Sequence, residues 1–420
     1  MAAHLTLSPA AEQAVRTLGR TDIVIGIPSY NNARTIGHVV RAAQAGLIKY
    51  FPSSRGAIVN SDGGSQDGTQ QQVIEARLPE LSVLQVDHPL YPVQRLTTPY
   101  HGLPGKGSAF RTIFQVAEAL GAKACAVVDS DLRSISPEWI EMLVRPALEK
   151  GFDFVAPYYL RHKYDGTITN SIVYPVTRAL YGKRIRQPIG GDFGFSGRLV
   201  SDYLRYDVWQ SDVARFGIDI WVTTTAICGG FSLCQAFLGA KLHDAKDPAS
   251  DLSAMLAQVV GSLFAEMERH ADIWTGVSGS EDVPIFGFQF AVGTEPVNVN
   301  IKRMVDSFRR AHHDLSGIWS MVLPEPTMLG LRSLAAAAED RFSFGDALWV
   351  RVVYDFAVAY RRRVMDRGHL LHSLTPIYLA WVASFILQVQ EAGPTEVEER
   401  LERLCLTYET EKTYLISRWK

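Results

Sequence analysis

Short apolar runs alternate with segments of helical periodicity through the first half of the chain. The apolar runs end in polar or glycine-rich residues, and we expect them to be strands at residues 22–28, 56–61, 82–87 and 124–128. The helical patterns between and after them cover residues 35–45, 67–76 and 107–120. Strands and helices that alternate at this spacing predict a mostly parallel α/β sheet of the doubly wound, Rossmann-like kind that binds nucleotides.

The pattern changes near residue 250, where strand-like runs give way to helical periodicity. Apolar residues recur at helical spacing from Leu252 to Met267, and later helical patterns cover residues 304–313, 347–363 and 370–390. We therefore predict two domains. Residues 1–249 form the α/β domain, and residues 250–420 form a mainly α-helical C-terminal domain.

One apolar stretch of the second domain, at residues 370–389, approaches the length of a membrane span. Polar residues that include His372, Pro376 and Gln388 interrupt it. Because polar side chains are unfavourable at the depth of the bilayer, we expect a buried helix and no membrane span. A peripheral membrane contact is the alternative.

The charge balance limits the classes of partner. The 420 residues include 42 Lys and Arg against 44 Asp and Glu, which leaves a net charge of -2. This balance gives no electrostatic reason to expect nucleic acid as a partner, and an anionic substrate needs a local basic pocket.

The four cysteines form no CxxC pair and the N-terminus lacks the pattern of a secretion signal, so we expect buried thiols and a cytoplasmic protein.

Two aspartates follow the last predicted strand of the first half, in the sequence AVVDSDL at residues 126–132. Alternate side chains of a strand share a face, so Asp129 and Asp131 would project into one site. A divalent cation would remove the repulsion between their carboxylates, and such oxygen ligands suit Mg²⁺ or Mn²⁺. The alternative is a solvated loop with a capping aspartate.

Polar turns also follow the first two strands and precede the third helix. Tyr30 in IGIPSYNN could stack on a base, and Asp62 in NSDGGSQDGT could accept a hydrogen bond from a base or ribose; both segments are also compatible with simple turns. Lys106, between two glycines before a helix, is well placed to bind a pyrophosphate, because helix N-termini favour anions. The spacing of a P-loop is absent.

In this order, the turns resemble those of the GT-A nucleotide-sugar glycosyltransferases. Among them, the chain is similar to the retaining glucosyl-3-phosphoglycerate synthases and to the mannosylglycerate and glucosylglycerate synthases. The resemblance covers roughly residues 22 to 250. The motifs that carry it are PSYNN at 28–32, SDGGSQDGT at 61–69, PGKG at 104–107, DSDL at 129–132, QPIGGD at 187–192, GID at 217–219 and His243.

The resemblance implies a GT-A fold and a role for each matching residue. The residues implied to contact the donor nucleotide sugar are Pro28, Tyr30, Asn31, Asp62, Lys106, Asp129, Ser130, Gly190 and Gly191. Asp131 and His243 are implied to bind Mg²⁺ or Mn²⁺. Asp219, with Lys106 and Asp131, is implied to act at the reacting centre, where Asp219 binds hydroxyls of the donor sugar. Asp192 stands where related sequences often carry Glu, which leaves its role open.

The segment at residues 158–170 resembles the acceptor loop of this family. The resemblance implies that Arg161 and Thr169 contact a glycerate-like acceptor, and that Gln187 and Ile189 lie on the acceptor side. We expect Lys163 to be a solvated surface charge. The loop lacks the longer Gly-Gly-Arg-Val-Thr pattern of the relatives that use phosphoglycerate, which favours an unphosphorylated glycerate.

The implied activity is metal-dependent transfer of a glucosyl or mannosyl group, with retention, from a nucleoside diphosphate sugar to a small hydroxy acid such as D-glycerate. Three alternatives remain at this stage. They are a glucosyl-3-phosphoglycerate synthase, a sugar-phosphate nucleotidyltransferase and a non-catalytic nucleotide-sugar-binding module. Exposed faces of the C-terminal helices are compatible with a homodimer.

Overall fold

The computed structural model describes residues 7–76, 94–99, 105–211, 213, 217–242, 248–290, 293, 295, 297–338 and 341–419. The chain divides into two compact units. The first, which we call the sheet unit, comprises Met1–Leu160, Arg186–Ala245 and Val283–Thr294. The second, the helical unit, comprises Arg161–Ile185, Lys246–Asp282 and Glu295–Lys420. We expected one boundary between residues 249 and 250, whereas the chain passes between the units five times.

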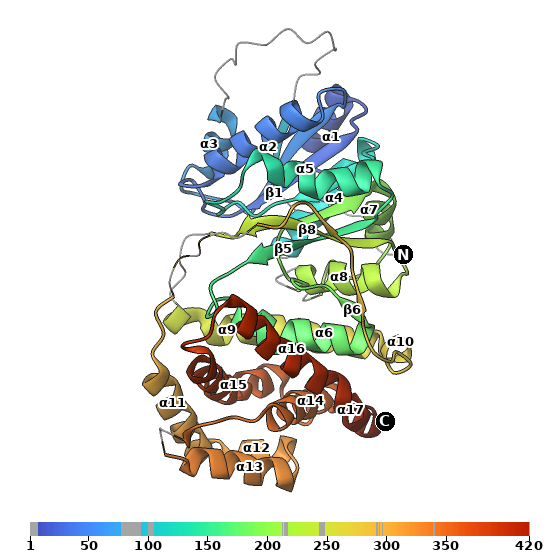
Figure 1. The fold of residues 1–420 in the computed structure, drawn as a ribbon. Helices are drawn as coiled ribbons and strands as arrows, with labels where there is room; N and C mark the ends of the chain where they lie inside the picture. Colours follow the sequence, from blue (N-terminus) through green and yellow to red (C-terminus); the bar gives the residue numbers. More distant parts are fainter. Residues whose placement is uncertain are drawn as a thin grey trace. The chain divides into compact units, whose positions relative to one another are not determined.

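A mostly parallel sheet of eight strands forms the centre of the sheet unit (Figure 1). The order of the strands is β10-β8-β5-β7-β4-β1-β2-β3, and β7 runs antiparallel to both of its neighbours. The strands are β1 (Ile23–Ser29), β2 (Gly56–Asp62), β3 (Gln94–Pro99), β4 (Ala124–Val127), β5 (Phe154–Leu160), β7 (Phe193–Ser196), β8 (Leu233–Ala240) and β10 (Ile285–Phe286). The predicted α/β class with a mostly parallel sheet is confirmed.

The strand that pairs with β2 on its outer side was not among the predicted strands. The expected strand at residues 82–87 lies outside the described residues. The strand that pairs with β2 is β3, Gln94–Pro99, in parallel register from Ala57 opposite Gln94 to Asp62 opposite Pro99. Periodicity misses β3 because its sequence, QRLTTP, contains a single aliphatic residue.

Helices cover both faces of the sheet. Along β1, Ile23, Ile25 and Ile27 join the core formed with α2 and α5, whereas a Cβ at Gly26 would lie 2.4 Å from Ile113 Cγ2 of α4. Alternate residues therefore face opposite helical layers, as the pleat of a strand requires. The helices are α1 (Pro9–Leu18), α2 (Ile36–Tyr50), α3 (Thr69–Glu75), α4 (Lys106–Ala119), α5 (Pro137–Glu149), α7 (Gly197–Leu204) and α8 (Ile218–Cys228).

Helices make up nearly all of the helical unit. They are η1 (Thr169–Val173, a π-helix), α6 (Tyr174–Tyr181), α9 (Pro248–Arg269), α10 (Ala271–Trp274), α11 (Ile301–Asp314), α12 (Ser316–Val322), α13 (Glu325–Ala336), α14 (Asp346–Arg362), α15 (Arg367–Val389), α16 (Pro394–Thr410) and α17 (Lys412–Trp419). Two short strands, β6 (Lys183–Arg184) and β9 (Glu281–Asp282), pair with each other. The predicted helical C-terminal region is confirmed.

Within the described part of the chain, α15 is the one helix that is long and apolar enough to cross a membrane. In its most apolar window, 72% of the residues are buried inside the protein. Trp381 stacks on Phe385 with ring centroids 5.2 Å apart, and on Trp349 of α14 at 5.8 Å. Its apolar surface therefore packs against protein, which confirms the predicted buried helix.

The helical unit takes the segment 161–185 from within the predicted first domain, and Arg178 on α6 explains why. Its side chain has no exposed surface and pairs with two glutamates of α16, through Nη1 to Glu402 at 2.5 Å and through Nε to Glu409 at 2.7 Å. Leaving this guanidinium without partners would cost several kcal/mol. These contacts join α6 to α16, so the segment folds with the helical unit.

Candidate active site

Topology gathers polar residues at one edge of the sheet. Parallel strands β1, β2, β4, β5 and β8 end at this edge, and the antiparallel β7 begins there. Because Val127 pairs with Phe193, the residues after β4 lie beside those before β7. The order of the strands reverses at β1, because β2 and β3 lie on one side of β1 and β4 lies on the other. Doubly wound sheets bind ligands at such a point.

Five charged residues meet at this edge, and we call them the carboxylate–lysine cluster: Lys106, Asp129, Asp192, Asp219 and Lys241. Lys106 Nζ lies 2.8 Å from Asp129 Oδ1 and 3.2 Å from Asp219 Oδ1. Lys241 Nζ lies 2.8 Å from Asp129 Oδ2 and 2.8 Å from Asp192 Oδ2. Asp129 therefore sits between two lysines, and each lysine reaches a second carboxylate.

The predicted repulsion between Asp129 and Asp131 is resolved differently in the structure. Strand β4 ends at Val127, so both aspartates lie in the turn that follows instead of on one strand face. Asp129 obtains its counter-charges from Lys106 and Lys241. The expected strand geometry is therefore wrong, and this carboxylate needs no cation to balance its charge.

Asp192 is fully buried and links three parts of the fold. Its Oδ1 accepts a hydrogen bond from the backbone N–H of Asp129 at 2.8 Å, and its Oδ2 accepts one from the Tyr159 hydroxyl of β5. Lys241 Nζ also donates to the Gly190 carbonyl at 2.8 Å. The role that the sequence left open for Asp192 is to hold the ends of β4, β5 and β8 together.

The cluster sets its carboxylates to different proton affinities. Burial acts to raise the pKa of Asp129, but Lys106 and Lys241 outweigh it and hold the pKa far below its ordinary value. Burial raises the pKa of Asp192, and Asp129 adds to that effect. Burial also raises the pKa of Asp219. For Lys106, burial acts to lower the pKa, but Asp129 and Asp219 outweigh it and raise the pKa.

Two glycines allow the cluster to close. Gly191 has φ of +87°, and a Cβ there would lie 2.3 Å from Asp129 Oδ2. At Gly190, a Cβ would lie 2.1 Å from Pro157 Cγ. Both positions therefore exclude larger residues, because a side chain would collide with Asp129 or Pro157. This reason is separate from the close approach to a donor sugar that the resemblance implies.

Asp62 organises the turn after β2. It is 1% exposed. Its Oδ1 accepts from Ser65 N at 2.8 Å and Gln70 Nε2 at 2.8 Å, and its Oδ2 accepts from Ser29 Oγ at 2.8 Å. These bonds occupy both oxygens, and with Ser65 Oγ they hold the pKa of Asp62 below its ordinary value although burial acts to raise it. A nucleoside contact through Asp62 would have to displace one of these donors.

The turn after β1 is tied to the turn after β4. Ser130 Oγ donates to Asn32 Oδ1 at 2.8 Å, and Asn31 takes a positive φ of 53°. Tyr30 is 63% exposed. It lies directly after β1, which includes Pro28, so its ring is accessible for the predicted stacking on a base.

The predicted metal ligands are only partly described. Asp131 forms no hydrogen bond or ion pair with the residues that the structure describes, whereas Asp129 is fully engaged. His243 lies outside the described residues. Its neighbour Leu242 accepts from Arg133 N at 2.9 Å and donates to Ser134 Oγ at 2.9 Å. Among the described residues, no three His, Cys, Asp or Glu side chains form a metal-binding group.

The predicted acceptor residues belong to different units. Gln187 and Ile189 precede β7 in the sheet unit, whereas Arg161 and Thr169 belong to the helical unit. Arg161 Nη1 pairs with Asp165 Oδ2 at 3.3 Å, and Thr169 is buried at the start of η1. The four predicted acceptor residues therefore do not share one unit.

The prediction for Lys163 as a solvated charge is wrong. Its Nζ donates to the carbonyls of Val389 at 2.9 Å, Gln390 at 2.6 Å and Ala392 at 3.2 Å. These carbonyls lie at the C-terminal end of α15, where a helix favours a cation. Lys163 therefore fixes its loop to the end of α15.

Sequence reasoning missed Lys241. It stands in KLHDAK directly after an apolar run, and its position two residues before His243 gives no local signal of a buried ammonium. The signal that could have found it is the strand itself, because Lys241 follows β8 as Asp129 follows β4.

Comparisons with known proteins gave structural similarity only. No protein-family model matches the chain, and no curated protein matches it. It is similar to glucosyl-3-phosphoglycerate synthase from Mycobacterium tuberculosis with Mn²⁺, UDP and glucosyl-3-phosphoglycerate, at 20% identity over 60% of this chain and 81% of that chain, with a TM-score of 0.44. A structure of that enzyme with Mg²⁺ and UDP gives 20% identity, 62% and 84% coverage, and a TM-score of 0.43.

Proposed function

We propose that this protein is a metal-dependent glycosyltransferase that moves a glucosyl or mannosyl group, with retention, from a nucleoside diphosphate sugar to D-glycerate or a similar small hydroxy acid. The observation that carries the proposal is the carboxylate–lysine cluster. It lies at the sheet edge near β1 and β4, where the order of the strands reverses, and its Lys106 is the first residue of helix α4.

Lys106 is the group suited to the donor diphosphate. Its ammonium is held at the N-terminus of α4, where the helix dipole adds to its charge. On donor binding, phosphate oxygens would replace Asp129 or Asp219 as its partners. Lys106 would then stabilise the charge that develops on the leaving diphosphate.

Asp219 is the carboxylate suited to the sugar. Its Oδ1 lies 3.2 Å from Lys106 Nζ. A diphosphate bound to Lys106 would therefore bring the sugar attached to it close to Asp219. The carboxylate can accept hydrogen bonds from sugar hydroxyls. We assign no nucleophile. In the proposed same-face substitution the acceptor oxygen bonds to the anomeric carbon, the bond from that carbon to the phosphate oxygen breaks, and this oxygen takes the acceptor proton.

A divalent metal fits the residues at Asp131. This carboxylate is half-buried and stands two residues after Asp129 of the cluster. It forms no ion pair in the described structure, so its oxygens are available to a hard cation. We propose Asp131 and His243 as its protein ligands. A bound Mg²⁺ or Mn²⁺ supplies Lewis-acid neutralisation of the diphosphate.

The charges near the predicted acceptor loop favour glycerate over 3-phosphoglycerate. Lys163 is committed to three carbonyls. The pKa of His162 is lowered by burial and by Lys163, so this imidazole is neutral at pH 7. Arg161 remains, and it is already paired with Asp165. One arginine suits the single carboxylate of glycerate better than the added charge of a phosphate.

A product screen tests the proposal. The purified protein is incubated with UDP-glucose or GDP-mannose, Mg²⁺ or Mn²⁺, and D-glycerate or 3-phosphoglycerate, and the products are analysed by mass spectrometry and NMR. We expect a hexosylglycerate whose anomeric configuration matches the donor. Release of pyrophosphate from a nucleoside triphosphate and a sugar phosphate, or no transfer above the heated protein, would contradict it.

Asp131→Ala tests the metal site separately. We expect Mn²⁺ affinity to fall by roughly 100-fold or more, because loss of a direct ligand should cost at least as much as loss of an outer partner of a ligand, while the circular dichroism spectrum stays unchanged. Mn²⁺ binding is measured by electron paramagnetic resonance. Asp67→Ala, an exposed aspartate of the β2–α3 turn, is the control. Equal Mn²⁺ affinity in the wild type and in Asp131→Ala would remove Asp131 from the site.

A further inference from the structure

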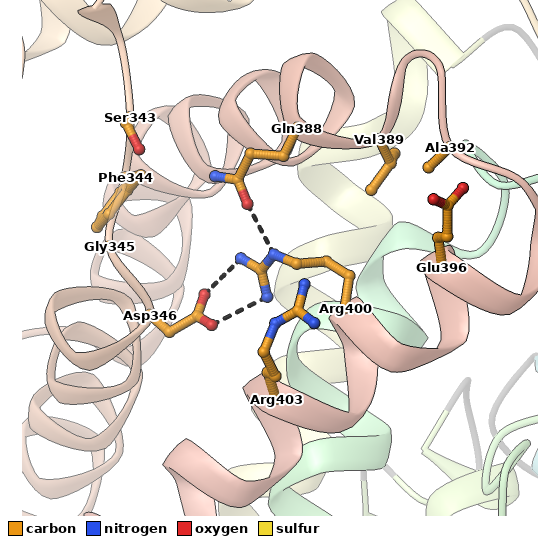
Figure 2. A pocket seen from close by; sticks show the side chains of 10 residues that line it. All are labelled: Ser343, Phe344, Gly345, Asp346, Gln388, Val389, Ala392, Glu396, Arg400 and Arg403. Carbon is orange, nitrogen blue, oxygen red and sulfur yellow. Dashed lines mark hydrogen bonds and ion pairs between the residues drawn. The ribbon is translucent and has the colours of Figure 1, made fainter.

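A cavity of about 560 Å³ opens in the helical unit (Figure 2). None of its lining residues belongs to the proposed active site. It lies between the start of α14, the C-terminal end of α15 and the first half of α16. Its volume falls within the range of sites for small metabolites. The lining residues are Ser343, Phe344, Gly345, Asp346, Gln388, Val389, Ala392, Glu396, Arg400 and Arg403.

The cavity holds a buried arginine in a fixed orientation. Arg400 Nη1 and Nη2 donate to the two carboxylate oxygens of Asp346 at 2.9 and 2.6 Å, and Nε donates to Gln388 Oε1 at 2.7 Å. Its side chain is 9% exposed. A guanidinium has five N–H donors, so two of them remain for a further acceptor.

The second arginine of the cavity, Arg403, is exposed and forms no ion pair with the described residues. Arg403 forms no hydrogen bond or ion pair through its guanidinium with the part of the chain that the structure describes. Asp346 pairs with Arg400, whereas Glu396 Oε2 accepts from the backbone Gly393 N at 2.7 Å and forms no ion pair with Arg403 in the described structure. Arg403 stands three residues after Arg400 on one face of α16, and Figure 2 shows their guanidinium groups near each other.

Helix α14 adds positive potential to the same cavity. It begins at Asp346, and its N-cap, Gly345, provides no side chain to accept from the first backbone N–H groups. Those groups and the helix dipole therefore favour an anion in front of this turn. The two arginines, not the helix end, define the site.

We propose that this cavity binds a small anionic metabolite through a phosphate or carboxylate group, held by Arg403 and by the free donors of Arg400. An anion there would give Arg403 an ion-pair partner, which the described residues do not provide. A guanidinium pair matches the planar oxygen geometry of such groups.

The occupied cavity would also act on the loop that contains Lys163. The carbonyls of Val389 and Ala392, whose residues line the cavity, both accept from Lys163 Nζ. A ligand that orders this turn stabilises the anchor of the loop at residues 161–170. The significance of this loop for the acceptor rests on the proposed function; the binding itself does not.

Calorimetric titration of the full-length protein with inorganic phosphate, and separately with D-glycerate, tests the site without any donor. We expect saturable binding, with a phosphate affinity that falls by roughly tenfold or more in Arg403→Gln. Arg310→Gln, which replaces an exposed arginine of α11, is the matched control and keeps the wild-type affinity. Lys106→Met also keeps it, because that lysine belongs to the other site.

Each outcome decides between the cavity and other anion sites. Equal phosphate binding in the wild type and in Arg403→Gln, or loss of binding in Lys106→Met alone, would overturn the cavity site. Tighter binding of phosphate than of D-glycerate would identify the phosphate group as the recognised chemistry, and the reverse would identify the carboxylate.

Hydrogen–deuterium exchange tests the coupling to the loop. We expect phosphate to slow exchange at residues 161–170 in the wild type and in Lys106→Met, but not in Arg403→Gln. Unchanged exchange in the wild type at saturating phosphate would overturn the coupling. Neither measurement depends on turnover, so failure of the glycosyltransferase proposal would leave both results interpretable.

Discussion

At the scale of single residues, the neighbours of each aspartate decide its behaviour more than its place in a motif. Asp129 and Asp131 stand two positions apart, yet Asp129 is held by two lysines and Asp131 by none of the described residues. Lys241 produces much of this difference, because it pairs with Asp129 and with the buried Asp192. We therefore regard Lys241 as a positioning residue of the proposed site.

Lys241→Met removes the ammonium from between Asp129 and the buried Asp192. We expect kcat/KM for the donor to fall by roughly 100-fold or more, and the free energy of unfolding to fall by about 3 kcal/mol or more, because the buried Asp192 loses its cation while Asp129 keeps only Lys106. Kinetics at a temperature where circular dichroism shows a folded protein separate the two effects. Lys241→Arg should recover part of the activity.

Lys123→Met is the control for this substitution, since Lys123 is an exposed lysine of the same unit that pairs with Asp22. It should change stability by about 1 kcal/mol or less. If Lys241→Met kept full activity, Lys241 would have no part in turnover.

At the scale of elements, the position of β7 determines where the site forms. Gly194 lets β7 pass under α5, because a Cβ there would lie 2.0 Å from the Leu143 carbonyl oxygen and 3.0 Å from Val155 Cβ. Backbone atoms cannot yield as a flexible side chain can. The close approach holds β7 between β4 and β5, and so places Asp192 at the sheet edge.

Gly194→Ala should therefore separate β7 from α5. We expect it to lower the free energy of unfolding by roughly 3 kcal/mol or more, which chemical denaturation measures. Gly317→Ala, where a Cβ would meet nothing within 4 Å, is the control and should change stability by about 1 kcal/mol or less. Equal effects of the two substitutions would contradict the packing explanation.

At the scale of the whole molecule, each unit is built from separated stretches of chain. The C-terminal α17 closes the helical unit through Lys412, which is 6% exposed. Its Nζ donates to the carbonyls of Ala179 at 2.9 Å, Leu180 at 3.3 Å and Val277 at 2.7 Å. The end of the chain therefore helps to hold α6 within the helical unit.

Stability should depend on the titration of Lys412. Burial lowers its pKa to about 8 from an ordinary 10.5. Between these values the unfolded chain binds more protons than the folded protein, so the free energy of unfolding rises with pH, by up to about 3 kcal/mol from this group. Below pH 8 the full cost of the buried charge is present.

Urea denaturation at several pH values between 7.5 and 10 measures this effect, and the range brackets the folded pKa of about 8. We expect the free energy of unfolding of the wild type to rise with pH relative to that of Lys412→Met. Other groups that titrate in this range cancel in the difference. A constant difference across the range would show that Lys412 keeps an ordinary pKa in the folded protein.

Local patterns predicted three of the strands that end at the site, β1, β2 and β4, but not β5 or β8. β1, β2 and β4 begin at or within one residue of the predicted starts, because apolar runs bounded by polar turns report burial directly. The strand β3 was not predicted, since QRLTTP has no strong apolar pattern. The sequence singled out Lys106, Asp129 and Asp219, and the structure brings these three residues into one cluster.

By itself, the sequence determined the mostly parallel sheet, the helical C-terminal region and the turns from which the site is made, because these depend on periodicity and on residue types at strand ends. Only the tertiary structure decided that Lys241 and Asp192 complete the cluster, that Lys163 binds the end of α15, and that residues 161–185 fold with the helical unit. These features depend on which buried charges find partners far away in the chain, and local patterns carry no record of such pairings.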